Sequence, residues 1–391
     1  MVAAVRSGRS LRAVARQFAV GLGTVQLWVR RAEGRSLDQV DWEDRSHAPR
    51  RQPGQTPESV ERLALDARRA LKDSDLGEFG AQAIQDRLRQ EPGLGEAQVP
   101  SVSTINRILR RHGLFDGRRR VRRKPPPPGW YLPEVAAGRA EIDESDFVEG
   151  LFMEGGQELF VLNVISLHGG LCASWLHTNT RADFVRACLV SHWRQFGLPA
   201  YAQFDNGAVF AGPRQYTDAV GSVIRMCLSL RVTPVFSVPR EFGIQSAIES
   251  YNNQWEQKVW HRFHFESQEE AQRCSNRYVA ALRRKRGGRQ DTAPQRRAFP
   301  TDWREPEHLP RQGRVILLRR TGDVGSADVL GRKCPVDEHW CHRLVRCEID
   351  LETDQVRVYG LRRQEPDHQP LLNKWSFRLP DKTRSRRRQT E

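Results

Sequence analysis

The sequence YAQFDNGAVF at residues 201–210, together with FGIQSAIESYNNQWE at 242–256, decides the fold class of this chain. The first stretch predicts a short strand that ends at Asp205, where Gly207 permits a sharp turn. The second stretch has apolar residues at helical spacing, and Glu249 lies off that apolar stripe. A strand that ends in an acid and a later helix that carries a second acid indicate a mixed α/β domain.

Segments on either side of these stretches supply the rest of the domain. Apolar runs separated by Gly-containing turns predict strands, and runs with a period of 3.6 residues predict helices. The expected strands are 143–152, 158–166, 171–177 and 232–238, and the expected helices are 181–196, 214–229 and one that begins near 244. Three strands, helix, strand, helix, strand and helix is the order of a ribonuclease-H-like mixed sheet.

Three acids mark this order: Asp146 in the first strand, within DFVEGL, Asp205 after the fourth strand, and Glu249 on the following helix. Mg²⁺ prefers oxygen ligands in octahedral geometry, so a site needs carboxylates from different elements and coordination positions for water and phosphate. Asp143 is an alternative first ligand. Strand alternation places Asp143 on the face opposite Asp146. The DFVEGL context favours Asp146, and the choice between the two stays open.

These residues carry a resemblance to a known family. The middle of the chain resembles the catalytic core of retroviral-integrase-like transposases, and the layout of roughly residues 10–375 is similar to that of a bacterial insertion-sequence transposase. The resemblance implies an enzyme in which Asp146, Asp205 and Glu249 hold two divalent ions, Mg²⁺ or Mn²⁺, in each active site. It further implies that the enzyme cuts transposon ends and joins their 3′ hydroxyls to target DNA, without a protein nucleophile.

The chain departs from the family pattern at three places. Asp143 stands where relatives commonly carry a Trp before the first acid, and Ser166 ends the second strand where many relatives have an Asp. The segment between Asp205 and Glu249 is longer than is common, which predicts an enlarged loop or helix at 211–231. Two other functions stay open: a DNA-binding regulator or architectural protein with an inactive core, and a nuclease without strand transfer.

Two segments near the N-terminus predict helix-turn-helix units that bind DNA. Residues 10–31 have apolar side chains at helical spacing on both sides of a break at 19–21, although an ordinary helical hairpin shares this pattern. A second unit follows, with Ser101 or Ser103 as a helix cap. Its helices are expected at 58–73, 81–90 and 101–112. The expected DNA contacts are Thr24, Gln26, Arg30 and Arg31 in the first unit, and Ser103, Thr104, Arg107, Arg110 and Arg111 in the second.

Further DNA contacts are expected outside these units. A basic run before Pro125–Pro128 predicts a stiff spacer that follows the DNA backbone. Its expected contacts are Arg118, Arg119, Arg120, Arg122 and Arg123. On the helix of Glu249, Asn252 and Asn253 lie on a polar face that is expected to meet DNA.

The predicted organisation is multidomain, with all-α units first, a central α/β ribonuclease-H-like sheet, and a small β barrel at the C-terminal end. The predicted boundaries are 1–33 for the first helix-turn-helix, 34–57 for a linker, 58–117 for the second helix-turn-helix domain, 118–135 for the basic and Pro-rich linker, 136–290 for the catalytic core, 291–313 for a linker, 314–378 for the barrel and 379–391 for a basic tail. Short alternating runs such as RVILLRR and QVRVYGLR are the basis for the barrel.

Composition and charge favour a cytosolic protein that binds a polyanion, and the resemblance implies a DNA-binding protein of the bacterial cytoplasm, associated with the nucleoid. The 391 residues carry a net charge of +15, and both ends are basic whereas residues 134–277 are acidic overall. Basic ends suggest arms that bind a polyanion around a middle whose carboxylates have another task. We expect no membrane span or signal peptide, because the apolar runs are too short. All seven Cys follow residue 171, which fits a reducing compartment.

The expected partners are double-stranded DNA, both transposon ends and target, and further copies of the chain in a homo-multimer; the need for an accessory ATPase stays open.

Two competing sites are less favoured. Zinc at Cys334, Cys341, His342 and Cys347 lacks the paired Cys-x-x-Cys spacing of structural sites. A recombinase with a covalent DNA intermediate needs a nucleophile such as Tyr251, which lies on a predicted buried stripe.

Overall fold

The computed structural model describes residues 1–43, 56–114, 128–212, 218, 220–239, 241 and 243–379. The predicted contacts from Arg118 to Arg123 and the basic tail beyond Leu379 lie outside these residues. The chain divides into two compact units, Met1–Glu58 and Ser59–Glu391. Within the described ranges, no helix has both the length and the apolar character needed to cross a membrane.

Short helices form the first unit. They are α1 (Val2–Arg6), α2 (Leu11–Gln17) and α3 (Leu22–Arg31), followed by the 3₁₀ turn η1 (Leu37–Gln39). Ser10 starts α2 because its hydroxyl accepts a hydrogen bond from the Ala13 amide at 3.3 Å, which satisfies an N–H group left free at the helix start. Val14 of α2 and Val25 of α3 are fully buried in one small core. The predicted pair of helices around a tight turn is confirmed.

The second unit begins with another group of helices. They are α4 (Glu58–Asp73), α5 (Ala81–Leu88), the 3₁₀ turn η2 (Glu96–Gln98) and α6 (Val102–Arg111). Ser101 caps α6, since its hydroxyl accepts a hydrogen bond from the Thr104 amide at 3.2 Å. Ile84 of α5 and Ile105 of α6 are fully buried in the core that these helices share. The predicted helices are therefore observed, with ends that differ by at most two residues.

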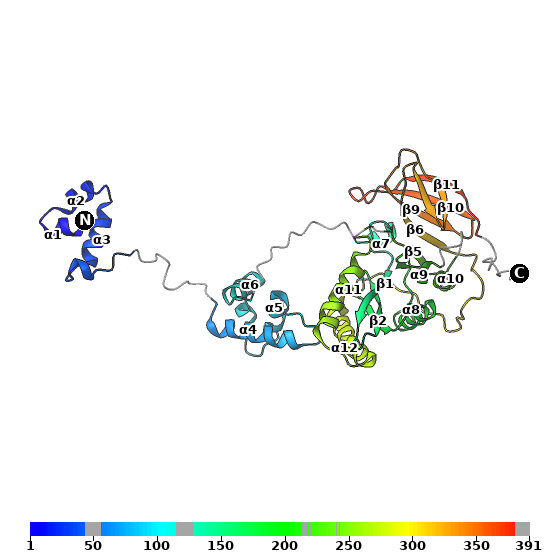
Figure 1. Ribbon diagram of the computed structural model, residues 1–391, viewed down its shortest axis with the longest axis horizontal. Coiled ribbons are helices and arrows are strands. Elements are labelled where there is room, and N and C mark those ends of the chain that lie inside the picture. Colours follow the sequence, from blue (N-terminus) through cyan, green and yellow to red (C-terminus); the bar gives the residue numbers. More distant parts are fainter. Residues whose placement is uncertain are drawn as a thin grey trace. The chain divides into compact units, whose positions relative to one another are not determined.

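A nine-stranded mixed sheet forms the centre of the second unit (Figure 1). Its strand order is β11-β10-β9-β6-β5-β4-β1-β2-β3. The strands of the predicted core are β1 (Ile142–Phe152), β2 (Glu158–Ser166), β3 (Cys172–His177), β4 (Tyr201–Phe204) and β5 (Thr233–Phe236). β1, β2 and β3 form an antiparallel meander, whereas β4 pairs in parallel with both β1 and β5. The predicted mixed α/β sheet is confirmed.

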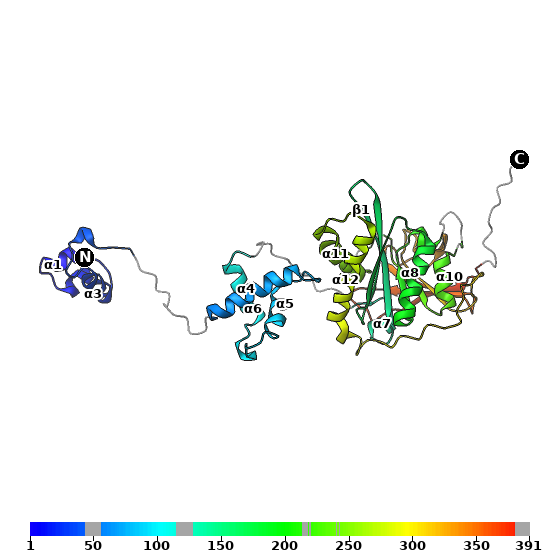
Figure 2. The ribbon, with the colours of Figure 1, turned by 90° about the horizontal axis from the view of Figure 1, so that it is seen from below.

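Helices cover both faces of this sheet (Figure 2). Those on one face are α8 (Ala182–Phe196), α9 (Ala208–Ala211) and α10 (Ser222–Ser229), and those on the other are α11 (Ser246–Lys258) and α12 (Gln268–Arg286). Alternation along β2 supplies both cores: Leu162 and Val164 pack with the α8 side, and Val161 and Ile165 pack with α11 and α12. The remaining helical turns are α7 (Pro133–Ala136), η3 (Trp260–Arg262) and η4 (Gly287–Arg289).

The helix predicted at 214–229 is shorter than expected, because α10 begins only at Ser222. Gly221 precedes it and donates its amide hydrogen to the Ala211 carbonyl at 3.0 Å. Gly212 has a φ of +102°, and a Cβ added there would lie 2.7 Å from the Gly221 nitrogen. Two glycines therefore allow the backbones after α9 and before α10 to meet, and residues 213–217 and 219 lie outside the described part of the chain.

The C-terminal strands extend the central sheet. They are β6 (Arg314–Arg320), β9 (Leu344–Asp350), β10 (Gln355–Leu361) and β11 (Leu371–Ser376), with a separate hairpin of β7 (Ser326–Val329) and β8 (Arg332–Pro335). The predicted C-terminal antiparallel strands are confirmed. They were expected as a separate barrel, but β6 pairs in parallel with β5, where Phe236 lies opposite Leu317. This pairing covers the edge of β5, whose backbone groups would otherwise lack strand partners.

Candidate active site

Strand pairing places Asp146 beside Asp205. β1 and β4 are parallel, and their register sets Glu144 opposite Gln203. Asp205 directly follows β4. If this register is continued two residues farther along each strand, Asp146 lies opposite Asp205. Neighbouring strands lie about 4.8 Å apart. Two carboxylates therefore lie near each other where β4 ends beside the middle of β1.

The loop after β4 fixes the direction of Asp205. The Gly207 amide donates a hydrogen bond to Asp205 Oδ1 at 2.9 Å, and the Asn206 side-chain amide donates to the Ser237 carbonyl at 2.5 Å. A Cβ added to Gly207 would lie only 3.0 Å from Asp205 Oδ1. A glycine at this position thus leaves room for the carboxylate. The sharp turn expected at Gly207 does not itself require a glycine, because its φ of −55° is one that any residue adopts.

An open cleft of about 520 Å³ lies over this pair of acids. Its lining includes Asp146, Asp205, Gly207 and Thr180. Burial, followed by the nearby charge of Asp205, raises the pKa of Asp146 from 3.8 to about 7, and the charge of Glu249 acts in the same direction. These effects show that the three acids lie near one another and that Asp146 is short of positive charge.

Glu249 reaches this region from the first turn of α11. Its side chain is exposed, whereas Ile248 and Tyr251 on the same helix are fully buried. Glu144 holds the start of the helix, because its Oε2 accepts a hydrogen bond from the Ile248 amide at 2.9 Å. Burial raises the pKa of Glu144 to about 8, and the charge of Glu249 adds to this shift.

The donor set fits a hard divalent cation in type and charge, because carboxylate oxygens that repel one another are what Mg²⁺ and Mn²⁺ bind. In the ranges that the structure describes, no three His, Cys, Asp or Glu side chains converge closely enough to form a ready-made metal site. Asp146 and Asp205 are therefore neighbours in an open arrangement, and Glu249 is near enough for its charge to act on Asp146.

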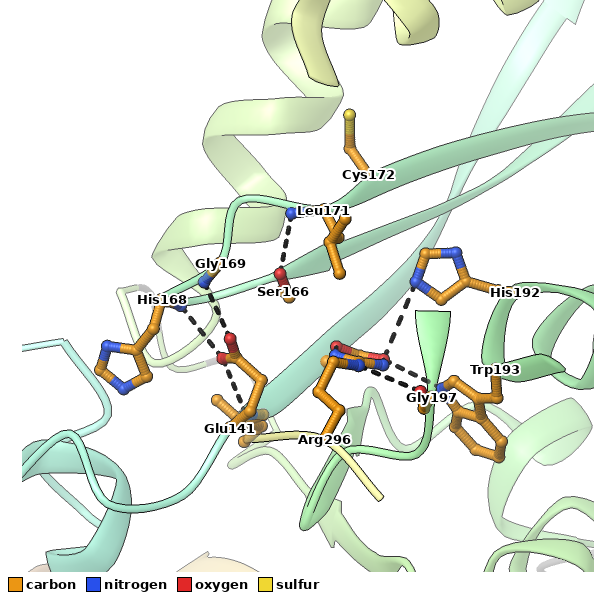
Figure 3. Close-up of polar contacts among 12 residues, drawn as sticks. Glu141, Ser166, His168, Gly169, Leu171, Cys172, His192, Trp193, Gly197 and Arg296 are labelled. Carbon is orange, nitrogen blue, oxygen red and sulfur yellow. Dashed lines mark hydrogen bonds and ion pairs between the residues drawn. The ribbon is translucent and has the colours of Figure 1, made fainter. Parts of the chain in front are cut away.

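Asp143 has a different environment on the opposite face of β1, where it contacts Trp193 and Arg296. Figure 3 shows these two partners. Its carboxylate accepts two hydrogen bonds from the Arg296 guanidinium, both at 2.7 Å, and one from Trp193 Nε1 at 2.9 Å. Burial is the largest single influence on the pKa of Asp143 and raises it, but the charge and hydrogen bonds of Arg296, together with the contributions of His192 and Trp193, outweigh burial and the pKa is lowered. Because its carboxylate is occupied by Arg296 and faces away from Asp205, the geometry favours Asp146 as the first ligand.

Ser166 is the last residue of β2 and precedes the turn that leads to β3 (Figure 3). The Ser166 hydroxyl accepts a hydrogen bond from the Leu171 amide at 2.8 Å. Glu141 accepts hydrogen bonds from the amides of His168 at 3.0 Å and Gly169 at 2.8 Å. The turn is thus stabilised by side chains of its own, and Glu141 is a structural acid that the sequence interpretation missed.

The predicted DNA contacts of the first unit separate into two groups. Thr24, Gln26 and Arg30 are exposed on α3. Arg31 instead donates hydrogen bonds to the Glu43 carbonyl at 2.7 Å and to Asp41 at 3.2 Å, and it lies over the Trp28 ring. Arg31 therefore takes part in the unit's own structure.

A similar division holds in the second unit. Ser103, Arg107 and Arg110 are exposed on α6. The Thr104 hydroxyl lies 3.0 Å from that of Ser101, and the exposed Arg111 forms an ion pair with Glu61.

On α11, Asn253 is exposed, but Asn252 contacts Asp146 and Asn163, so the structure moves Asn252 from the DNA face to the carboxylates. Asn163 was not singled out from the sequence. Its signal was a single amide inside the apolar run ELFVLNVIS.

No family model matches the chain. The crystal structure of the catalytic core domain of BIV integrase is similar at 12% identity, with a TM-score of 0.28, over 36% of this chain and 81% of that chain. The cryoEM structure of the simian T-cell lymphotropic virus intasome in complex with PP2A regulatory subunit B56 gamma is similar at 12% identity, with a TM-score of 0.30, over 72% of this chain and 88% of that chain. Both likenesses are too distant to bear on function.

Proposed function

We propose that this protein is a metal-dependent DNA transposase that cuts transposon ends and joins their 3′ hydroxyls to target DNA. The observation that carries the proposal is that Asp146, inside β1, and Asp205, at the end of the neighbouring β4, line one cleft, with Glu249 near enough on α11 for its charge to act on Asp146. These acids come from three different elements, and burial, followed by the charges of Asp205 and Glu249, raises the pKa of Asp146 to about 7. Carboxylates grouped in this way bind cations. The cleft over Asp146 and Asp205 leaves room for a phosphodiester.

Asp146, Asp205 and Glu249 would hold the divalent ions, Mg²⁺ or Mn²⁺. Two such ions, when bound, stabilise the entering and leaving oxygens of an in-line displacement at phosphorus. The chain itself orients the carboxylates and keeps an open cleft of about 520 Å³ above them. Tyr251 is not available as a nucleophile, because it is fully buried and its hydroxyl lies 2.7 Å from that of Ser174.

Exposed polar residues on α3 and α6 support binding of the transposon ends by the two helical groups. The chain's net charge of +15 favours a polyanion, and a synaptic complex of two ends would bring copies of the chain together. If about eight phosphates are contacted, affinity should fall roughly 10³- to 10⁵-fold between 50 and 200 mM salt. A shallow salt dependence would argue against these basic contacts.

One observation favours a second function, that of a DNA-binding regulator with an inactive core. The described residues contain no ready-made cluster of three metal ligands. The acids of an inactive core would be free to lose this geometry. An active core, in contrast, must gather the same three carboxylates when metal and DNA bind.

An excision and integration assay in cells separates the two functions. A marker is placed between the few hundred base pairs that flank the gene, and wild type is compared with Asp205→Asn, which keeps the size of the side chain but removes its charge. Glu154→Gln, at an exposed acid in the turn between β1 and β2, is the matched control. We expect movement with wild type and the control and none with Asp205→Asn.

Absence of movement with all three proteins, while they bind the flanks equally, would favour the regulator. Products that are cut but never joined would indicate a nuclease without strand transfer.

A further inference from the structure

Asp146 is connected to a buried amide through α11. In the antiparallel pair of β1 and β2, Asp146 lies directly opposite Asn163. Asn163 is fully buried, and its Nδ2 donates a hydrogen bond to Asn252 Oδ1 at 2.9 Å. Asn252 in turn donates from its Nδ2 to Asp146 Oδ2, also at 2.9 Å. Asn252 therefore bridges two neighbouring strands from the helix that carries Glu249.

The direction of this bridge follows from the chemistry of its ends. An ionised carboxylate only accepts hydrogen bonds, so Asn252 has to present its NH₂ group to Asp146 and its oxygen to Asn163. Asn163 Oδ1 is buried and has no hydrogen-bond partner in the part of the chain that the structure describes. A buried unpaired oxygen is costly, and an apolar residue at this place in β2 would avoid that cost. The arrangement thus favours orientation of Asn252 over stability.

A neutral partner suits an acid that must bind metal. Arg296 neutralises Asp143 on the other face of β1, and a guanidinium at Asp146 would compete with a metal in the same way. The Asn252 amide fixes one oxygen of Asp146 without cancelling its charge. Groups that orient a metal ligand in this way typically change metal affinity when they are removed.

We propose that Asn252, itself oriented by Asn163, is a positioning residue that sets the rotamer of Asp146 for metal binding. This inference rests on the proposed function, because it concerns the same carboxylates. It assigns Asn252 to the acid cluster, while the exposed Asn253 keeps the DNA-facing place on α11.

The test is Mn²⁺ binding to the full-length protein without DNA, measured by the spin-resonance signal of free Mn²⁺. Asn252→Ala should weaken binding about 10- to 100-fold, and Asn163→Ala should weaken it in the same direction. Gln257→Ala, at an exposed amide on the same helix, is the control and should bind as wild type. Thermal unfolding in EDTA shows that each variant is folded, and a purely structural role would change that transition instead of the affinity.

Wild-type affinity in both asparagine variants would overturn this inference and leave the proposed function intact. If wild type itself binds no Mn²⁺ at millimolar concentration, the proposed metal site and the inference both fail.

A second inference, carried by the first unit alone, concerns the outward face of α3. Val25 is fully buried, and the helical period of 3.6 residues places Leu27 on the opposite side, where its side chain is 57% exposed. Gly23 lies one turn before Leu27, and a Cβ added there would meet nothing within 4 Å. Gly23 therefore leaves the helix surface beside Leu27 without a side chain.

We infer that Leu27 contacts a thymine methyl group in the major groove. Arg30 on α3 and Arg12 and Arg16 on α2 are exposed in the same unit and supply the positive charge that duplex DNA requires. Apolar side chains distinguish thymine by its methyl group, the one apolar feature of the major groove. This inference also rests on the proposed function, because it names a feature of the DNA that α3 reads.

The full-length protein is used to select duplexes from a random library, and each thymine of the selected site is then replaced by uracil, which lacks only the methyl group. Wild type should bind about fourfold more weakly for one contacted methyl, and Leu27→Ala should not distinguish the two bases. Val324→Ala, at an exposed apolar residue after β6, should behave as wild type.

Equal binding of wild type to every uracil-substituted duplex would overturn the inference about Leu27 and leave DNA binding intact. Failure to select any duplex would count against both the inference and the proposed function.

Discussion

Asp143 and Asp146 lie on opposite faces of β1 and have opposite electrostatic surroundings. Asp143 is fully buried, accepts two hydrogen bonds from Arg296, and has a lowered pKa. Asp146, three residues later, has the acids Asp205 and Glu249 near it and a neutral amide as its donor, and its pKa is raised to about 7. Where the chain supplies its own cation, the acid is structural. Where the chain places acids together without a cation of its own, as at Asp146, we expect the neutralising positive charge to come from a bound ion.

The largest effect on stability is expected when the ion pair between Asp143 and Arg296 is broken. Arg296→Met should lower the free energy of unfolding by about 3–5 kcal/mol, because it leaves the buried Asp143 carboxylate without its ion pair. Denaturant unfolding measures this loss. The double variant Asp143→Asn with Arg296→Met should recover much of it. A loss below about 1 kcal/mol in the single variant would show that Asp143 is not held by Arg296.

A change of opposite sign in the free energy of unfolding is expected at Asp146, on the other face of β1. Asp146→Asn should stabilise the metal-free protein at pH 8 by on the order of 2 kcal/mol, and by much less at pH 4.5. The pKa of Asp146 is raised from 3.8 to about 7, so between these values the folded protein binds a proton that the unfolded chain has released, and stability falls as the pH rises. Asparagine removes this dependence.

Urea unfolding in EDTA across this pH range measures the difference between wild type and Asp146→Asn. A gain that does not change with pH would contradict the account of a charge-deficient acid. With millimolar Mg²⁺, wild type should regain stability at pH 8 and Asp146→Asn should regain less.

A smaller effect is expected at Trp193, the other donor of a hydrogen bond to Asp143. Trp193→Phe removes the indole N–H that donates to Asp143 at 2.9 Å, while most of the buried ring remains. We expect a loss of about 1–2 kcal/mol in the free energy of unfolding, since the donor serves a charged acceptor that keeps Arg296. Metal affinity, measured with Mn²⁺, should not change, because this residue lies on the face away from Asp146.

Local patterns predicted most of the fold. The ranges 58–73, 158–166 and 314–320 were each expected from apolar spacing and are observed as α4, β2 and β6. Patterns did not predict that β6 would pair in parallel with β5, because pairing between distant strands leaves no local trace in either sequence. β11 was missed for a related reason: as an edge strand it is half exposed and has no clear apolar alternation.

The candidate site divides along the same line. Asp205 and Glu249 were identifiable from a strand end, a glycine turn and a helix stripe, all of which are local. The partner of Asp143 is Arg296, which lies in a segment expected to be a linker. Asn252 was assigned to DNA from its helical offset, yet its partners belong to β1 and β2. The sequence thus indicated candidate acids, and only the packed sheet shows which cation or amide Asp143 and Asp146 contact.

The most direct test of the central claim is anomalous diffraction at the manganese edge, from crystals of the full-length protein grown with Mn²⁺. We predict a peak beside the carboxylates of Asp146 and Asp205 and none beside Asp143, whose carboxylate is already bound by Arg296. Crystals saturated with Mn²⁺ that show no peak at Asp146 and Asp205, or a peak at Asp143 instead, would contradict the account.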